Sequence, residues 1–115
     1  MSEQDDLEEL KKKLKNYNKE DIEFNEPHFT QQLIIRDGSR EEVINNVLNP
    51  VNLVYSYHEK GRHGDTVHCL HFKISNSRTL RIPVIFDRND KKGLYIITYI
   101  KRYRSWQNMI KRGKI

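Results

Sequence analysis

Residues 67–74 (VHCLHFKI), 79–87 (TLRIPVIFD) and 94–101 (LYIITYIK) decide the fold of this 115-residue chain. β-Branched and aromatic residues recur in these runs with a period of two, and a fourth run at 51–59 has the same character. Short polar connectors separate the runs. We therefore predict that consecutive strands pair as a four-stranded antiparallel meander sheet.

Helices are expected ahead of these strands. Residues 5–17 place apolar side chains at helical spacing, with acids first and lysines later, as the helix dipole favours. An early proline, Pro27, and a capping box at 39–42 mark two further helices. We predict one α+β domain over 25–115, preceded by an acidic amphipathic helical appendage over 1–24.

Strict alternation divides the strand residues between two faces. One face is almost wholly apolar and is assigned to the helices, with Thr98 on that side. The opposite face carries cationic and aromatic side chains, so function is expected there. Its members are His71, Lys73, Arg81, Ile85, Tyr95, Tyr99 and Lys101.

The net charge of +5 is distributed unevenly along the chain. Residues 1–26 hold nine acids and five lysines, whereas eight bases and no acid follow Asp90. This pattern suits a polyanion such as RNA, and a lysine-rich composition is the alternative explanation. A short basic helix at 103–112 would add an aromatic ring for base stacking. The candidate RNA-binding residues are Arg36, Lys73, Lys101, Arg102, Arg104, Trp106, Lys111 and Arg112.

Several classes of protein find no support in the sequence. Glycine motifs that cradle phosphates and the hydrolase elbow are missing, and a single cysteine, Cys69, cannot form an internal disulfide. His68 and His71 lie three apart, but on a strand their rings point to opposite faces, so neither a metal nor a cofactor is expected. No apolar run suits a membrane span or a signal peptide, and a cytoplasmic location is expected.

The outer face offers groups for RNA cleavage without a metal. This reaction needs a base near the 2′-hydroxyl, an acid near the 5′-oxygen and cations around the phosphate. His71 and Arg81 would lie on neighbouring strands, with Tyr99 or Lys101 on the next. A face that is polar because water wets it is the simpler interpretation of each residue. His28 opens a helix, where it could meet an anion or serve as a solvated cap.

The segment HFTQQLIIRDGSREEVINNVLNP, residues 28–50, resembles the opening of a family of small uncharacterised proteins. Members begin with His, a helix, Arg-x-Gly, a second helix and Asn-Pro. The run Tyr95-Ile-Ile-Thr-Tyr99 is similar to the family's last strand, although Thr98 and Tyr99 are adjacent here. Ser39 also replaces the isoleucine that usually follows the turn glycine.

This family is grouped with the barnase, colicin and RelE-like ribonucleases, many of which are toxins. The resemblance covers about residues 27–100 and implies a RelE/barnase-like fold and metal-independent RNA cleavage. The residues that match the family's pattern are His28, Arg36, Arg81 and Thr98.

The leading hypothesis is a metal-independent endoribonuclease of the toxin type. Its candidate catalytic residues are His28, His71, Arg81, Thr98 and Tyr99. RNA is the expected partner, in association with the ribosome, and an antitoxin or a second copy of the chain is a further expectation. The alternative is a non-catalytic RNA-binding or ribonucleoprotein subunit. A third hypothesis is an interaction module whose acidic helix binds a partner or masks the basic face.

Overall fold

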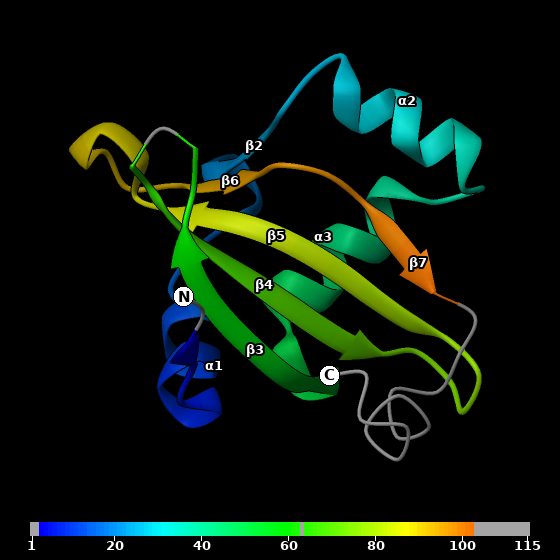
Figure 1. The fold of residues 1–115 in the computed structure, drawn as a ribbon, viewed down its shortest axis with the longest axis horizontal. Helices are drawn as coiled ribbons and strands as arrows, with labels where there is room; N and C mark the ends of the chain where they lie inside the picture. Colours follow the sequence, from blue (N-terminus) through cyan, green and yellow to red (C-terminus); the bar gives the residue numbers. More distant parts are fainter. Residues whose placement is uncertain (1–2, 63, 103–115) are drawn as a thin grey trace.

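The computed structural model describes residues 3–62 and 64–102 and confirms the predicted α+β class (Figure 1). Over these residues the α-helices are α1 (Leu7–Leu14), α2 (His28–Ile35) and α3 (Arg40–Leu48). The strands are β1 (Glu3–Gln4), β2 (Ile22–Phe24), β3 (Leu53–Lys60), β4 (Thr66–Lys73), β5 (Thr79–Phe86), β6 (Leu94–Ile96) and β7 (Ile100–Arg102).

The sheet is mixed and larger than the predicted four-stranded meander, and that part of the prediction was wrong. Its strand order is β1-β3-β4-β5-β6-β2, and β7 also pairs with β5. Strands β3 to β6 do pair consecutively and antiparallel, whereas β1 joins β3 antiparallel and β2 joins β6 in parallel. Residues 3–24, which belong to the appendage predicted over 1–24, thus supply both edge strands. Strands of two and three residues are too short to show a period.

Local capping explains where two of the helices begin. The Asp6 carboxylate accepts hydrogen bonds from the backbone N–H groups of Glu8 and Glu9 at 3.0 and 3.3 Å, which starts α1. The Ser39 hydroxyl accepts the N–H of Glu42 at 3.4 Å and starts α3, as the capping box predicted. None of the described helices is long and apolar enough to cross a membrane.

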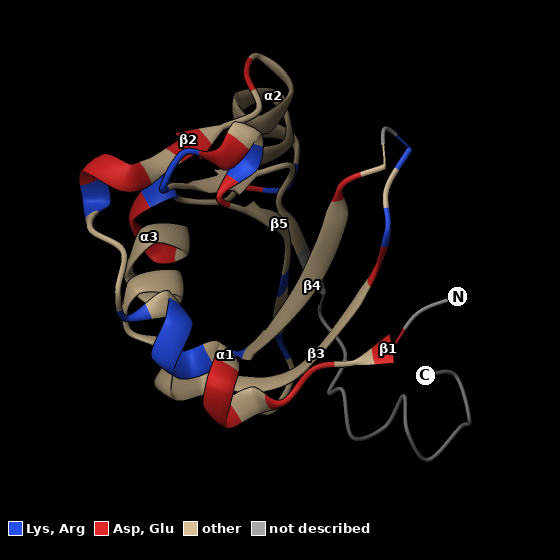
Figure 2. Cartoon of the chain, turned by 90° about the vertical axis from the view of Figure 1, so that its left-hand side faces the viewer, with Lys and Arg blue, Asp and Glu red and all other residues tan. Residues whose placement is uncertain are grey.

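The core lies between the sheet and the helices. Seen from the side, β3, β4 and β5 curve around α1 and α3 (Figure 2). Because α1 contributes Leu10 and Leu14 to this core, the N-terminal helix packs with the rest of the chain. The buried cluster comprises Leu10, Leu14, Tyr17, Phe29, Leu33, Val43, Val47, Leu53, Leu70, Phe72, Leu80, Ile82, Val84, Leu94, Ile96 and Tyr99.

A β-bulge at 97–99 interrupts the run that was predicted as one strand. Val84 of β5 pairs with Ile96 before the bulge, and Arg81 pairs with Ile100 after it. Two residues of β5 therefore face three residues on the partner side. The extra residue reverses the alternation of side chains beyond it.

Tyr99 is consequently in the core, and its predicted position on the outer face was wrong. Its side chain is fully buried, and its hydroxyl donates to the Glu42 carboxylate at 3.0 Å. A Cβ at Gly38 would lie 2.5 Å from the Tyr99 ring, so the turn between α2 and α3 needs a glycine there. The bulge, invisible to a strict period of two, is the reason for the error.

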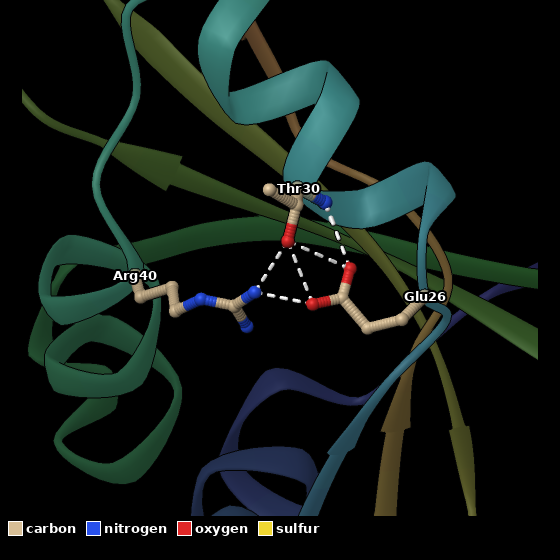
Figure 3. A network of polar contacts seen from close by, with 3 residues as sticks. All are labelled: Glu26, Thr30 and Arg40. Carbon is tan, nitrogen blue, oxygen red and sulfur yellow. Dashed lines mark hydrogen bonds and ion pairs between the residues drawn. The ribbon is translucent and has the colours of Figure 1, made fainter.

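A polar network joins the start of α2 to α3 (Figure 3). The Glu26 carboxylate accepts hydrogen bonds from the Thr30 N–H and hydroxyl and forms an ion pair with Arg40. The hydrogen bonds from Thr30 and then Arg40 lower the pKa of Glu26 to about 2. The Arg40 guanidinium also lies over the rings of Phe24 and Phe29, at 4.8 and 5.5 Å. These contacts give the network a structural role.

Candidate functional site

Side chains of three neighbouring strands meet on the face of the sheet opposite the core. We call this group the outer-face cluster, and its members are Tyr55, Tyr57, Cys69, His71 and Arg81. The register places Tyr55 of β3 opposite His71 of β4, and His71 opposite Arg81 of β5. Alternate residues of the same strands enter the core, so ordinary pleating produces the cluster. The structure thus brings together the predicted pair of His71 and Arg81.

The outer-face cluster is held by one cation and by contacts between aromatic rings. Arg81 Nη2 donates to the Tyr57 hydroxyl at 2.8 Å and lies 3.7 Å from Cys69 Sγ. The ring of His71 meets the rings of Tyr55 and Tyr57 nearly edge-on, with centroids 5.3 and 5.9 Å apart. The two tyrosines, His71 and Arg81 are half-buried. His71 Nε2 and Arg81 Nε are shielded from solvent.

This environment favours the protonated form of the Tyr57 hydroxyl. Burial raises the pKa of its hydroxyl, and the neighbouring Cys69 adds to the effect while the Arg81 charge opposes it. At neutral pH the hydroxyl therefore keeps its proton and can donate it. A guanidinium beside aromatic rings is a combination that binds phosphates and stacks on bases. Sequence analysis missed Tyr55 and Tyr57, although their alternation on one strand was available as a signal.

A second polar group lies on the opposite side of the same strands. We call it the inner-face cluster, and its members are Glu3, Asp5, Ser56, His58 and His68. Asp5 follows β1, and its two carboxylate oxygens lie 2.6 Å from His58 Nδ1 and 3.0 Å from His68 Nδ1. The Ser56 hydroxyl donates to the same carboxylate at 2.6 Å. Glu3 lies 3.4 Å from His58 Nε2.

The charge of Asp5 is stabilised within the inner-face cluster. Burial favours its neutral form, but hydrogen bonds from Ser56, His68 and His58 outweigh burial and lower the pKa of the carboxyl. The three ligand atoms of Asp5, His58 and His68 lie within 4.8 Å of one another, so they could hold a metal ion. Sequence analysis missed this cluster because it compared histidines along one strand instead of across two.

His28 and Thr98 form a second pair of predicted residues. The Nε2 atom of His28, at the start of α2, lies 3.0 Å from the Thr98 hydroxyl in the bulge. Arg36 ends α2, where its exposed side chain donates to Gln32 at 3.0 Å. The predicted catalytic residues therefore divide between the His28–Thr98 pair, the outer-face cluster and the core position of Tyr99.

The predicted RNA-binding residues occupy varied positions. Lys73 is half-buried at the end of β4, opposite Thr79 of β5. Lys101 and Arg102 lie in β7, whose backbone pairs with Leu80 and Thr79. The predicted basic helix lies outside the described residues, together with Arg104, Trp106, Lys111 and Arg112.

The basic excess belongs mainly to the end of the sequence. Four of the 21 lysines and arginines lie in 103–115, so residues 1–102 hold 17 bases and 16 acids. Helix α1 carries acidic residues in its first turn and lysines in its last turn (Figure 2). Any affinity of the sheet for RNA must therefore come from local groups such as the outer-face cluster rather than from its net charge.

Comparison with known proteins gives no relative for this fold: no family model, no curated protein and no solved structure matches the chain. The resemblance to the barnase, colicin and RelE-like ribonucleases thus remains a prediction from short motifs. The functional argument rests on the geometry of the two clusters.

Proposed function

We propose that the protein is a metal-independent endoribonuclease that binds single-stranded RNA at the outer-face cluster. The observation that carries the proposal is Arg81, held between Tyr57 and the strand that bears His71. The fixed guanidinium would bind a phosphate, and the ring of Tyr55 would stack on an adjacent base. This combination favours an exposed strand of RNA, because bases in a duplex are already stacked on one another.

The same cluster contains groups suited to each proton transfer. His71 would take the proton of the 2′-hydroxyl as its oxygen attacks the phosphorus, and a 2′,3′-cyclic phosphate forms when the bond to the 5′-oxygen breaks. Tyr57, which keeps its proton at neutral pH, would protonate the leaving 5′-oxygen. Arg81 would stabilise the charge that develops on the phosphate. Because His71 Nε2 is shielded, His71 would act through Nδ1.

A non-catalytic RNA-binding protein is the second candidate. The observation that favours it is the division of the predicted catalytic residues, since His28 contacts Thr98 whereas His71 pairs with Arg81. Stacking rings and one guanidinium suffice to bind RNA without any proton transfer. In this case the outer-face cluster would bind RNA without cleaving it.

The test incubates the protein with labelled mixed-sequence RNA in EDTA, at low and moderate salt. Wild-type protein, Arg81→Ala and His71→Ala are compared, and Arg36→Ala is the matched arginine control because its side chain is exposed on α2. Circular dichroism verifies that each variant is folded in EDTA. We expect wild type and Arg36→Ala to leave 2′,3′-cyclic phosphate ends, and the two cluster variants to be inactive.

Three other outcomes are informative. Salt-dependent binding without cleavage selects the non-catalytic candidate. Equal loss of cleavage in Arg36→Ala moves the site from the sheet to α2. Neither binding nor cleavage by the folded wild-type protein overturns the proposal.

A further inference from the structure

We propose that Asp5, His58 and His68 of the inner-face cluster form a binding site for a divalent transition-metal ion of the Zn²⁺ type. The site is independent of the proposed ribonuclease function, because its residues point to the opposite face of β3 and β4 from His71 and Tyr57. Two imidazoles and one carboxylate are a ligand set that suits Zn²⁺ and its neighbours much better than Mg²⁺.

The backbone fixes the two imidazoles before any ion arrives. His58 and His68 are direct cross-strand partners in the antiparallel pair of β3 and β4. Side chains at such positions leave the sheet on the same face with their Cβ atoms about 5 Å apart. Their ring centroids are 5.3 Å apart, and both Nδ1 atoms are turned toward Asp5.

The third ligand comes from another segment of the chain. Asp5 is anchored next to β3 by its own N–H, which donates to the Ser56 carbonyl at 2.9 Å. A zinc ion with bonds of about 2.0–2.1 Å places tetrahedral ligands about 3.3–3.4 Å apart. The present separations of 2.6 and 3.0 Å, to the two oxygens of Asp5, are shorter, so the carboxylate would move away from the two rings to admit the ion.

The surroundings of the three ligands resemble the outer shell of a metal site. When Nδ1 of a histidine binds a metal, its hydrogen resides on Nε2, which usually donates to a carboxylate or carbonyl. Glu3 lies 3.4 Å from His58 Nε2 and fits this role. Ser56 likewise donates to Asp5 and would orient the carboxylate. The ion would replace the Nδ1 hydrogens that now face Asp5, so its binding would release protons.

An ion can reach this place from solvent. The side chains of His58 and His68 are 33% and 20% exposed, whereas that of Asp5 is only 8% exposed. Water can complete the coordination on the histidine side. The ion would then tie the segment before α1 to both strands, and binding would stabilise the folded protein.

The experiment uses the full-length chain without a histidine tag. Co²⁺ is titrated as a spectroscopic probe, Zn²⁺ is then added in competition, and melting temperatures are measured with Zn²⁺, with Mg²⁺ and with EDTA. We compare wild type with Asp5→Asn and His68→Gln, which preserve side-chain size. His28→Gln is the control, since it removes an imidazole at the start of α2.

We expect one equivalent of Co²⁺ to give visible absorption bands that Zn²⁺ abolishes. Zn²⁺ at about 100 times its dissociation constant should raise the melting temperature by at least about 5 °C, and Mg²⁺ should not. Asp5→Asn and His68→Gln should weaken Zn²⁺ binding at least about tenfold, and His28→Gln should not.

Absence of Co²⁺ bands in folded wild type would overturn the proposal and leave the cluster as a hydrogen-bonded anchor. Equal binding by wild type and His68→Gln would also overturn it. If a variant fails to fold, histidine nitrogen NMR of the wild-type protein decides the question. Zn²⁺ must then shift the Nδ1 signals of two histidines, and shifts in none or in others contradict the site.

Discussion

The two clusters occupy opposite faces of the same hairpin of β3 and β4, and they differ in chemistry. The outer-face cluster combines two phenols, an imidazole and a guanidinium, whereas the inner-face cluster combines two imidazoles with carboxylates. A shift of one residue along a strand exchanges the two faces. Each cluster can therefore be altered by substitutions that leave the other intact.

The difference shows how a histidine acquires its role. His68 and His71 are three residues apart on β4, yet one lies 3.0 Å from an ionised carboxylate and the other among tyrosine rings. A carboxylate facing a histidine nitrogen offers a place where a cation can replace the shared hydrogen. Aromatic rings beside an arginine instead prepare a surface for bases and phosphates.

The largest expected effect is on RNA affinity, which should depend on the outer face and not on the inner face. Joint replacement Tyr55→Ala and Tyr57→Ala should lower RNA affinity by more than tenfold, because a stacked base contributes about 1–3 kcal/mol. Binding of Co²⁺ or Zn²⁺ should not change. Fluorescence anisotropy with a labelled single strand measures the RNA affinity. Unchanged affinity in the folded double variant would remove the outer face as the binding surface.

Stability should respond most strongly on the inner face. In metal-free buffer at pH 7, Asp5→Asn should lower the free energy of unfolding by about 1–3 kcal/mol, since it disturbs hydrogen bonds to a buried carboxylate. Urea denaturation measures the difference. RNA affinity should be the same as in wild type, and a parallel loss of RNA affinity would show that the two faces are coupled.

This stability difference should also depend on pH. The pKa of Asp5 is lower in the folded chain than in the unfolded one. Its ionisation therefore stabilises the protein above the unfolded pKa of about 3.9, and this contribution is lost as the pH falls through the folded pKa. Wild type and Asp5→Asn should converge in stability below about pH 4, as denaturation at several pH values can test.

Tyr99→Phe should have a smaller effect, confined to the core. The variant loses the hydrogen bond to Glu42 and should be less stable by about 1 kcal/mol. RNA binding and cleavage should be unchanged, because the ring is fully buried. Denaturation and the RNA assay are the measurements. If the folded Tyr99→Phe protein does not cleave RNA, Tyr99 is a catalytic residue as first predicted.

Lys73→Ala should have the smallest effect and tests how far the RNA-binding surface extends along β4. If Lys73 meets one phosphate, the slope of log affinity against log salt should fall by about 0.7, the value for one contact with a single strand. Lys12→Ala on the exposed side of α1 is the matched control and should leave the slope unchanged. Equal salt-dependence slopes for Lys73→Ala and wild type would show that the RNA-binding surface does not extend along β4 beyond His71.

Much of the fold could be predicted because the signals are local. Capping at Ser39 and the long alternating runs of β3, β4 and β5 depend on neighbours in sequence, so α3 and the antiparallel hairpins were predicted correctly. The pairing of His71 with Arg81 followed from the same alternation and a short connector. The edge strands β1 and β2 were missed because they are held by partners distant in the chain.

The sequence by itself determined the α+β class, the central hairpins and the opposite faces of His68 and His71, because a period of two and short turns follow from the covalent geometry of the strand. Tertiary structure decided the rest. The bulge placed Tyr99 in the core, and the return of residues 3–5 to β3 placed Asp5 between two histidines. Contacts such as these join residues more than 50 positions apart, and no local pattern encodes which distant partner a side chain will meet.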